Sequence, residues 1–114
     1  MSAAENRNKL LHEVCQREFD PTETMQWVGM DKVKFWCWGV GRLYQWANKA
    51  LWFTVKGRYL KGSVLITLAW NDTYTVHFLN NKWEVVKKME EVYCDCLNEV
   101  IDNNIRSVEG LLRN

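Results

Sequence analysis

Lysine and tryptophan alternate with other residue types in the stretch KVKFWCWGV, residues 32–40. Successive side chains of a β-strand point to opposite sides, so a strand here would place both lysines and both tryptophans on one face. These four residues are Lys32, Lys34, Trp36 and Trp38. Indole rings stack on nucleobases or pack into protein interfaces, and ammonium groups bind phosphates or carboxylates. The stretch therefore indicates a binding surface.

The same alternation in later segments adds further residues to this predicted surface. The strand expected at 51–56 contributes Trp52 and Lys56, and the strand expected at 74–79 contributes His77. The candidate binding residues are Lys32, Lys34, Trp36, Trp38, Trp52, Lys56 and His77.

Charge is strongly segregated along a chain whose formal net charge is only +1. Residues 32–82 carry eight Lys or Arg and a single Asp, and they hold five of the seven tryptophans. Residues 1–31 and 83–114 each carry three more acidic than basic residues. The basic, tryptophan-rich middle supports the interpretation of a binding surface.

Several uses of that surface stay open. It can pack under the connection 41–50 or against a partner, either a second copy in a homodimer or another protein. It can also bind single-stranded nucleic acid, with bases stacked on indoles and phosphates held by lysines. The sequence favours a small protein-interaction module, with single-stranded nucleic-acid binding as the alternative.

Patterns typical of enzymes and metal sites are missing from the sequence. Cys94 and Cys96 lie two residues apart in a predicted helix, where their thiols would point away from each other. No P-loop, dinucleotide fingerprint, nucleophile elbow or HExxH motif is present. We therefore expect no enzymatic activity, no catalytic residue, no metal and no cofactor.

Length and composition predict one domain over residues 1–114, with residues 106–114 as a frayed tail. The chain is 47% hydrophobic and 25% charged, which is typical of a globular domain. The N-terminus lacks the pattern of a signal peptide, and no apolar stretch reaches the roughly 18 residues of a membrane span. Four irregularly spaced cysteines fit reduced thiols. We expect a cytoplasmic protein with no membrane contact.

Periodicity predicts the order helix, strands, helix. Ser2 and Glu5 form a capping box before a helix that should end near Phe19, and a short helical turn follows between Pro21 and Gly29. Strands are expected at 33–40, 51–56, 63–70 and 74–79, with a short additional strand around Tyr44. A three-residue loop, 71–73, would pair Leu68 with Val76 and keep the apolar faces separate.

The segment after the strands carries apolar residues at three- and four-residue steps. A capping box at Asn81 and Glu84 would start a long amphipathic helix running to about Ile105. The fold class is therefore predicted to be α+β. An antiparallel meander of four, possibly five, strands would be flanked by an N-terminal and a long C-terminal helix. Both helices would lie on one face, as a two-layer sandwich.

The C-terminal part resembles small proteins of phages and prophages. The shared pattern is V-Y-x-D-x-L-x-x-V-I-D, and it falls on Val92, Tyr93, Asp95, Leu97, Val100, Ile101 and Asp102. The resemblance, which covers about the last two-thirds of the chain, implies a phage- or mobile-element-derived context. It assigns no activity and no site residue.

Overall fold

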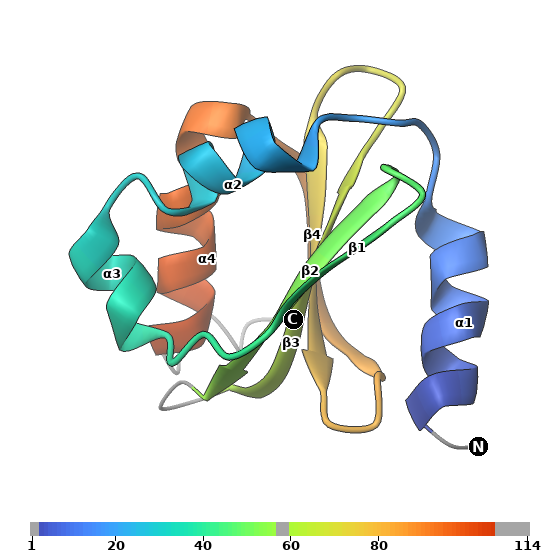
Figure 1. Ribbon diagram of the computed structural model, residues 1–114, viewed down its shortest axis with the longest axis horizontal. Helices are drawn as coiled ribbons and strands as arrows, with labels where there is room; N and C mark the ends of the chain where they lie inside the picture. Colours follow the sequence, from blue (N-terminus) through green and yellow to red (C-terminus); the bar gives the residue numbers. More distant parts are fainter. Residues whose placement is uncertain (1–2, 57–59, 107–114) are drawn as a thin grey trace.

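Five antiparallel strands form one sheet in the order in which they occur in the sequence (Figure 1). The strands are β1 (Leu43–Trp46), β2 (Ala50–Lys56), β3 (Lys61–Leu68), β4 (Tyr74–Asn80) and β5 (Val85–Val92). The helices are α1 (Ala3–Val14), α2 (Pro21–Val28), α3 (Lys32–Cys37) and α4 (Leu97–Arg106), with a 3-10 turn η1 (Cys94–Cys96) before α4. This confirms the α+β class, the antiparallel meander and the short strand around Tyr44.

The computed structural model describes residues 3–56 and 60–106. The predicted cap residue Ser2 and residues 107–114 of the predicted tail lie outside those ranges. Within the described ranges, none of the helices has the length and apolar character needed to cross a membrane.

The predicted strand at 33–40 is wrong, because its first part folds as helix α3. The carboxylate of Asp31 accepts a hydrogen bond from the amide of Lys34 at 3.2 Å and so caps the helix. The helix ends before Gly39, whose φ of 63° lies in the left-handed region that glycine adopts without strain.

The long helix predicted from Asn81 to Ile105 is also wrong, because its first half is strand β5. The side chain of Asn80 accepts hydrogen bonds from the amides of Lys82 and Glu84, which closes a hairpin where a capping box was expected. The register between β4 and β5 then shifts twice, once between Tyr74 and Val76. Only α4 remains of the predicted helix.

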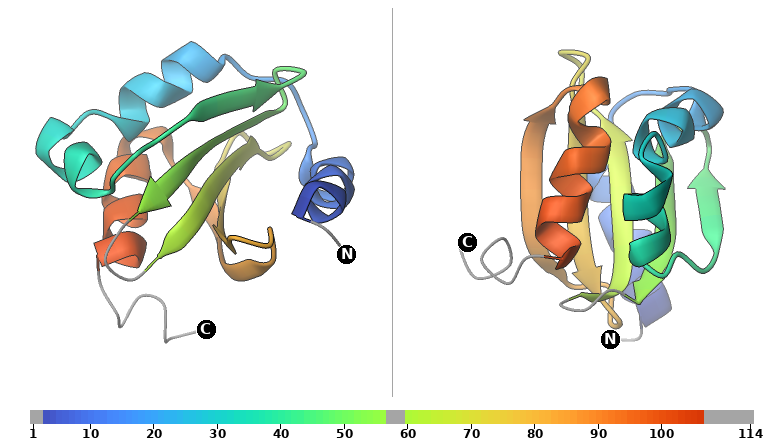
Figure 2. Two further views of the ribbon diagram at one scale, coloured as in Figure 1. Left: turned by 60° about the horizontal axis from the view of Figure 1, so that its bottom comes forward. Right: turned by 90° about the vertical axis from the view of Figure 1, so that its left-hand side faces the viewer.

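The sheet carries helices on both faces, so the prediction that both predicted helices share one face is wrong (Figure 2). Helices α2, α3 and α4 cover the face that includes Phe53, Ile66 and Val76. Helix α1 lies against the opposite face, where its apolar stripe meets Trp52 and Leu65. The opposite face also carries large apolar side chains, and α1 removes these from water.

The hairpin between β3 and β4 keeps the two faces separate, as predicted, but in a different register. Leu68 pairs with Tyr74 rather than with Val76, so five residues form the connection. Asn71 Oδ1 accepts hydrogen bonds from the amide and the hydroxyl of Thr73, at 3.3 and 2.6 Å, which stabilises this longer loop. The shift is by two residues, so each side chain stays on its predicted face.

Candidate functional site

The residues of the predicted binding face lie in three separate places. Lys32, Lys34 and Trp36 are on α3, where the indole of Trp36 is 82% exposed. Lys56 is exposed at the end of β2, and its amide donates a hydrogen bond to the carbonyl of Trp38 at 3.0 Å. This hydrogen bond keeps Lys56 near the end of α3. The other three candidate residues, Trp38, Trp52 and His77, are buried.

Trp38 belongs to the hydrophobic core and is fully buried. Its ring stacks on Phe53, with ring centroids 6.2 Å apart and planes 9° from parallel. Its Nε1 donates a hydrogen bond to Asp102 Oδ1 at 3.0 Å. These contacts make Trp38 a structural residue. The prediction that Trp38 belongs to the binding face is wrong.

Trp52 and His77 lie on the sheet face that α1 covers, and both are buried. Trp52 stacks on Tyr44, with ring centroids 5.5 Å apart. His77 Nδ1 lies 3.4 Å from the carbonyl oxygen of Leu65, and His77 Nε2 has no partner among the described residues. The pKa of His77 is lowered to about 4, chiefly by burial and in smaller part by nearby Lys88. Neither residue offers a free binding surface.

The most exposed edge of the sheet is β1, which sequence reasoning did not single out as a site. Its four residues, LYQW, include no charge, and the side chains of Leu43 and Tyr44 are 52% and 40% exposed. Such an edge offers unpaired backbone N–H and C=O groups to another strand. The opposite edge, β5, carries four charged residues and two register irregularities, and natural proteins use both features to block pairing.

The hydrogen-bond pattern shows which backbone groups of β1 face outward. The carbonyl of Arg42 accepts a hydrogen bond from the amide of Thr54 at 3.1 Å, which makes this a hydrogen-bonded pair of the ladder. Such pairs alternate with non-hydrogen-bonded pairs along an antiparallel ladder. Leu43 and Gln45 are therefore the residues whose N–H and C=O groups point away from β2.

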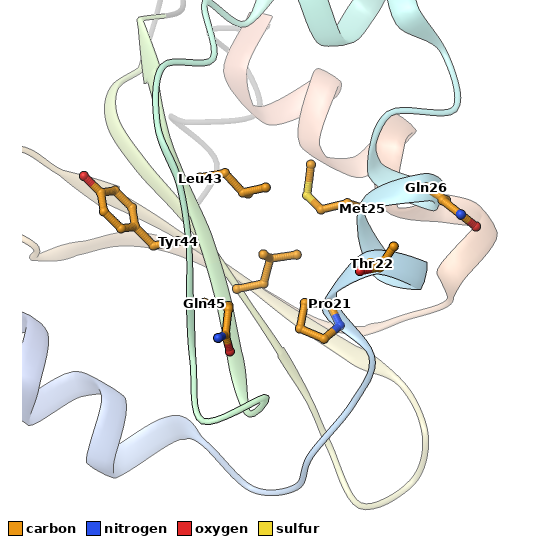
Figure 3. Close-up of a pocket in the computed structure, with 8 residues that line it drawn as sticks. Pro21, Thr22, Met25, Gln26, Leu43, Tyr44 and Gln45 are labelled. Carbon is orange, nitrogen blue, oxygen red and sulfur yellow. The ribbon is translucent and has the colours of Figure 1, made fainter.

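One face of β1 borders an apolar groove beneath α2 (Figure 3). The side chains of Leu43, Met25 and Pro21 point into the space between the strand and the helix. The groove has a volume of about 510 Å³, which is within the range of protein ligand sites. Its lining residues are Pro21, Thr22, Met25, Gln26, Leu43, Tyr44, Gln45 and Leu51.

One helix cap and one backbone hydrogen bond position this groove. Asp20 accepts a hydrogen bond from the amide of Thr22 at 2.9 Å, and Pro21 occupies the first turn of α2, as the sequence predicted. The amide of Phe19 donates a hydrogen bond to the carbonyl of Asn48 at 2.8 Å, which ties the segment before α2 to the turn after β1. Helix α2 is thereby held beside the edge strand.

The other face of β1 borders a smaller, more polar hollow beneath α1. Its volume is about 320 Å³, and its lining residues are Arg7, Asn8, Leu11, His12, Tyr44, Trp46 and Trp52. His12 meets Trp46 edge to face, with ring centroids 5.4 Å apart. Among the described residues, the guanidinium of Arg7 has no hydrogen-bond or ion-pair partner.

A second exposed apolar surface lies on α3. Val33 and Trp36 are 73% and 82% exposed, and together with Lys32 and Cys37 they line a shallow hollow of about 400 Å³. This surface keeps one tryptophan and one lysine of the predicted binding face side by side.

Metal and disulfide chemistry find no support in the described part of the chain. It contains no group of three or more His, Cys, Asp or Glu residues placed to hold a metal ion. All four cysteines are free thiols, and burial raises the pKa of Cys15 to about 11.

Comparison of the chain with protein-family models, with curated proteins and with solved structures finds no match. The resemblance to phage and prophage proteins therefore stays a prediction.

Proposed function

We propose that this protein is a non-enzymatic protein-binding module that takes an extended segment of its partner along the open edge of β1. The proposal rests on the contrast between the two edges of the sheet. Strand β5 is protected by Lys87, Lys88, Glu90 and Glu91 and by bulges, whereas β1 has no charge and no bulge. Cytoplasmic location is part of the proposal, and the four free thiols support it.

Strand addition explains why an apolar groove borders this edge. A partner strand would form hydrogen bonds with the outward N–H and C=O groups of Leu43 and Gln45, and these bonds supply affinity without regard to sequence. Alternate side chains of the same partner strand would enter the groove beside Met25 and Leu51. The groove then supplies the selectivity that backbone pairing lacks.

The proposal is tested by selecting displayed random peptides on the purified protein and mapping a selected peptide by amide chemical shifts. We expect the shifts to change along Leu43–Trp46 and to stay constant along Val85–Val92. The variant Gln45→Pro removes one outward N–H and should abolish binding. Gln45→Ala is the matched control, because it also loses the 3.1 Å hydrogen bond from the Asn48 amide to the Gln45 side chain but keeps the N–H.

Two substitutions that leave the net charge unchanged test the groove in the same assay. Leu43→Ser removes an apolar wall of the groove and should weaken binding, whereas Val85→Ser changes a residue of similar exposure on β5 and should not. Equal binding by Gln45→Pro and wild-type protein, or shift changes centred on β5, would contradict strand addition at β1.

Single-stranded nucleic acid is a second candidate partner, at a different surface. The observation that favours it is the exposed indole of Trp36 beside Lys32 on α3, since stacking on one aromatic ring contributes roughly 1–3 kcal/mol per base. An oligonucleotide should then quench tryptophan fluorescence at low salt and release as salt rises. Trp36→Ala should remove this quenching, whereas Trp70→Ala, which changes another indole that is 72% exposed, should not. Unchanged fluorescence at low salt would refute this candidate.

A further inference from the structure

The two hollows beside β1 lie on opposite faces of the same strand. Leu43 and Gln45 line the groove under α2, whereas Trp46 lines the hollow under α1. Side chains of a strand alternate between faces, so a strand added to β1 would present every second residue to each hollow. Each hollow would therefore select the side chains on one face of the partner strand.

The hollow under α1 is suited to a carboxylate. Arg7 offers a guanidinium that has no partner among the described residues, and Asn8 adds an amide donor. Within residues 3–56 and 60–106, no acidic residue lines this hollow. A guanidinium binds a carboxylate with two parallel hydrogen bonds, which is among the strongest polar contacts in proteins. Tyr44 and Trp46 line the same hollow.

The charges around β1 favour the same chemistry. Arg42 precedes the strand, Lys49 follows it, and the sequence has no Asp or Glu between Asp31 and Asp72. The nearest acidic residues of α2 are Asp20 and Glu23. Asp20 caps the helix, and neither residue is among the described residues that line the two hollows.

These charges also weigh against a second copy of this chain as the occupant. Two copies paired through β1 would bring two sets of Arg7, Arg42 and Lys49 toward each other, and facing like charges are destabilising. An acidic segment would neutralise the same residues. Charge complementarity therefore selects a partner protein over self-association.

Resting on the proposed strand addition, we infer that the bound segment is acidic and amphipathic. Its large apolar residues enter the groove lined by Met25, Leu43 and Leu51, and the Asp or Glu residues between them face Arg7 across β1.

Peptide display on three forms of the protein tests this inference. The forms are wild type, Arg7→Glu, and Lys9→Glu, which makes the same charge change at an exposed residue of α1 outside the hollow. Wild type and Lys9→Glu should select peptides in which apolar residues alternate with Asp or Glu. Arg7→Glu should select Lys or Arg at the acidic positions. A peptide selected on wild type should bind Arg7→Glu about tenfold or more weakly, as expected for loss of a charged hydrogen-bonded contact.

The outcomes separate this inference from the proposed function. Peptides that bind wild type but not Gln45→Pro, yet show no preference for acidic residues or bind Arg7→Glu equally well, would overturn the inference and leave strand addition standing. Sedimentation of wild type as a dimer that Gln45→Pro converts to a monomer would also overturn it, because a second copy would then occupy the edge. If no selected peptide loses binding in Gln45→Pro, both the inference and the proposed strand addition are overturned.

Discussion

Acidification should destabilise this protein through His77, which lies on the sheet face under α1. The imidazole is 2% exposed, and its Nδ1 has the Leu65 carbonyl as its partner, 3.4 Å away. A carbonyl only accepts, so Nδ1 carries the proton and Nε2, which has no partner among the described residues, is unprotonated. Protonating Nε2 would place a positive charge in a buried position near Lys88.

The size of the effect follows from the lowered pKa. The pKa of His77 falls from 6.5 to about 4 in the folded protein, chiefly because burial disfavours the charged ring. Between these two values the unfolded chain binds a proton at this residue and the folded chain does not. Stability from the neutral ring is therefore fully present above pH 6.5 and is lost as the pH falls toward 4. The loss is about 1.4 kcal/mol per pH unit, or about 3 kcal/mol over this window.

The measurement is the free energy of unfolding in denaturant at several pH values, for wild type and for His77→Gln. Glutamine cannot titrate, and its amide can still donate to the Leu65 carbonyl. The carboxylates titrate in both proteins, so their contribution cancels in the difference. We expect the wild type to lose about 2–3 kcal/mol more than His77→Gln between about pH 7 and pH 4.5. Parallel pH profiles for the two proteins would refute the buried, neutral state of His77.

Further predictions concern stability and thiol reactivity. Trp38→Ala should cost about 3–5 kcal/mol in denaturant melts because its ring is fully buried, whereas Trp36→Ala should stay within about 0.5 kcal/mol. Leu97→Ala should cost about 2–5 kcal/mol, and Glu99→Ala, on the exposed side of the same helix, less than about 0.5 kcal/mol. Burial raises the pKa of Cys15 from 9.0 to about 11. Cys15 should therefore be alkylated on the order of a hundredfold more slowly in native than in unfolded protein, as measured by mass spectrometry. Equal costs within either pair, or equal alkylation rates, would contradict the burial on which these predictions rest.

The central strands could be predicted from the sequence because two faces of different character impose a period of two. Phe53, Ile66 and Val76 lie on the face opposite to Trp52, and strands β2, β3 and β4 confirm the expected segments at 51–56, 63–70 and 74–79 with small changes in their ends. The faces survive even where the register differs, because a shift of two residues leaves every side chain on its own side.

Strand β5 looked helical for a physical reason. Met89 pairs with Val76 and Val92 pairs with Tyr74, so three steps along β5 match two steps along β4. The extra residue of this bulge, where Glu91 has a φ of 55°, allows two residues three positions apart to face the core. Three-residue spacing is also the mark of an amphipathic helix, and the sequence alone does not distinguish the two.

The predicted binding face failed for a related reason, because it depended on Trp36 and Trp38 sharing one side. In a helix, residues two apart point about 200° away from each other. Once Asp31 caps α3, Trp36 therefore turns to solvent and Trp38 turns into the core. The basic and aromatic character of the region persists, but only Lys32 and Trp36 remain together on one exposed surface.

Edge strands become recognisable only when the order of the strands is known. The residues LYQW of β1 are uncharged, which is unremarkable inside a sheet and exceptional at its border. The residues VVKKMEEV of β5 carry charges that would be costly between two neighbouring strands and are useful at an edge. Strand pairing places β1 and β5 at the two edges of the sheet. Their difference in charge then indicates which edge is protected against a further strand. One border carries features that discourage a further strand, and the other border lacks them.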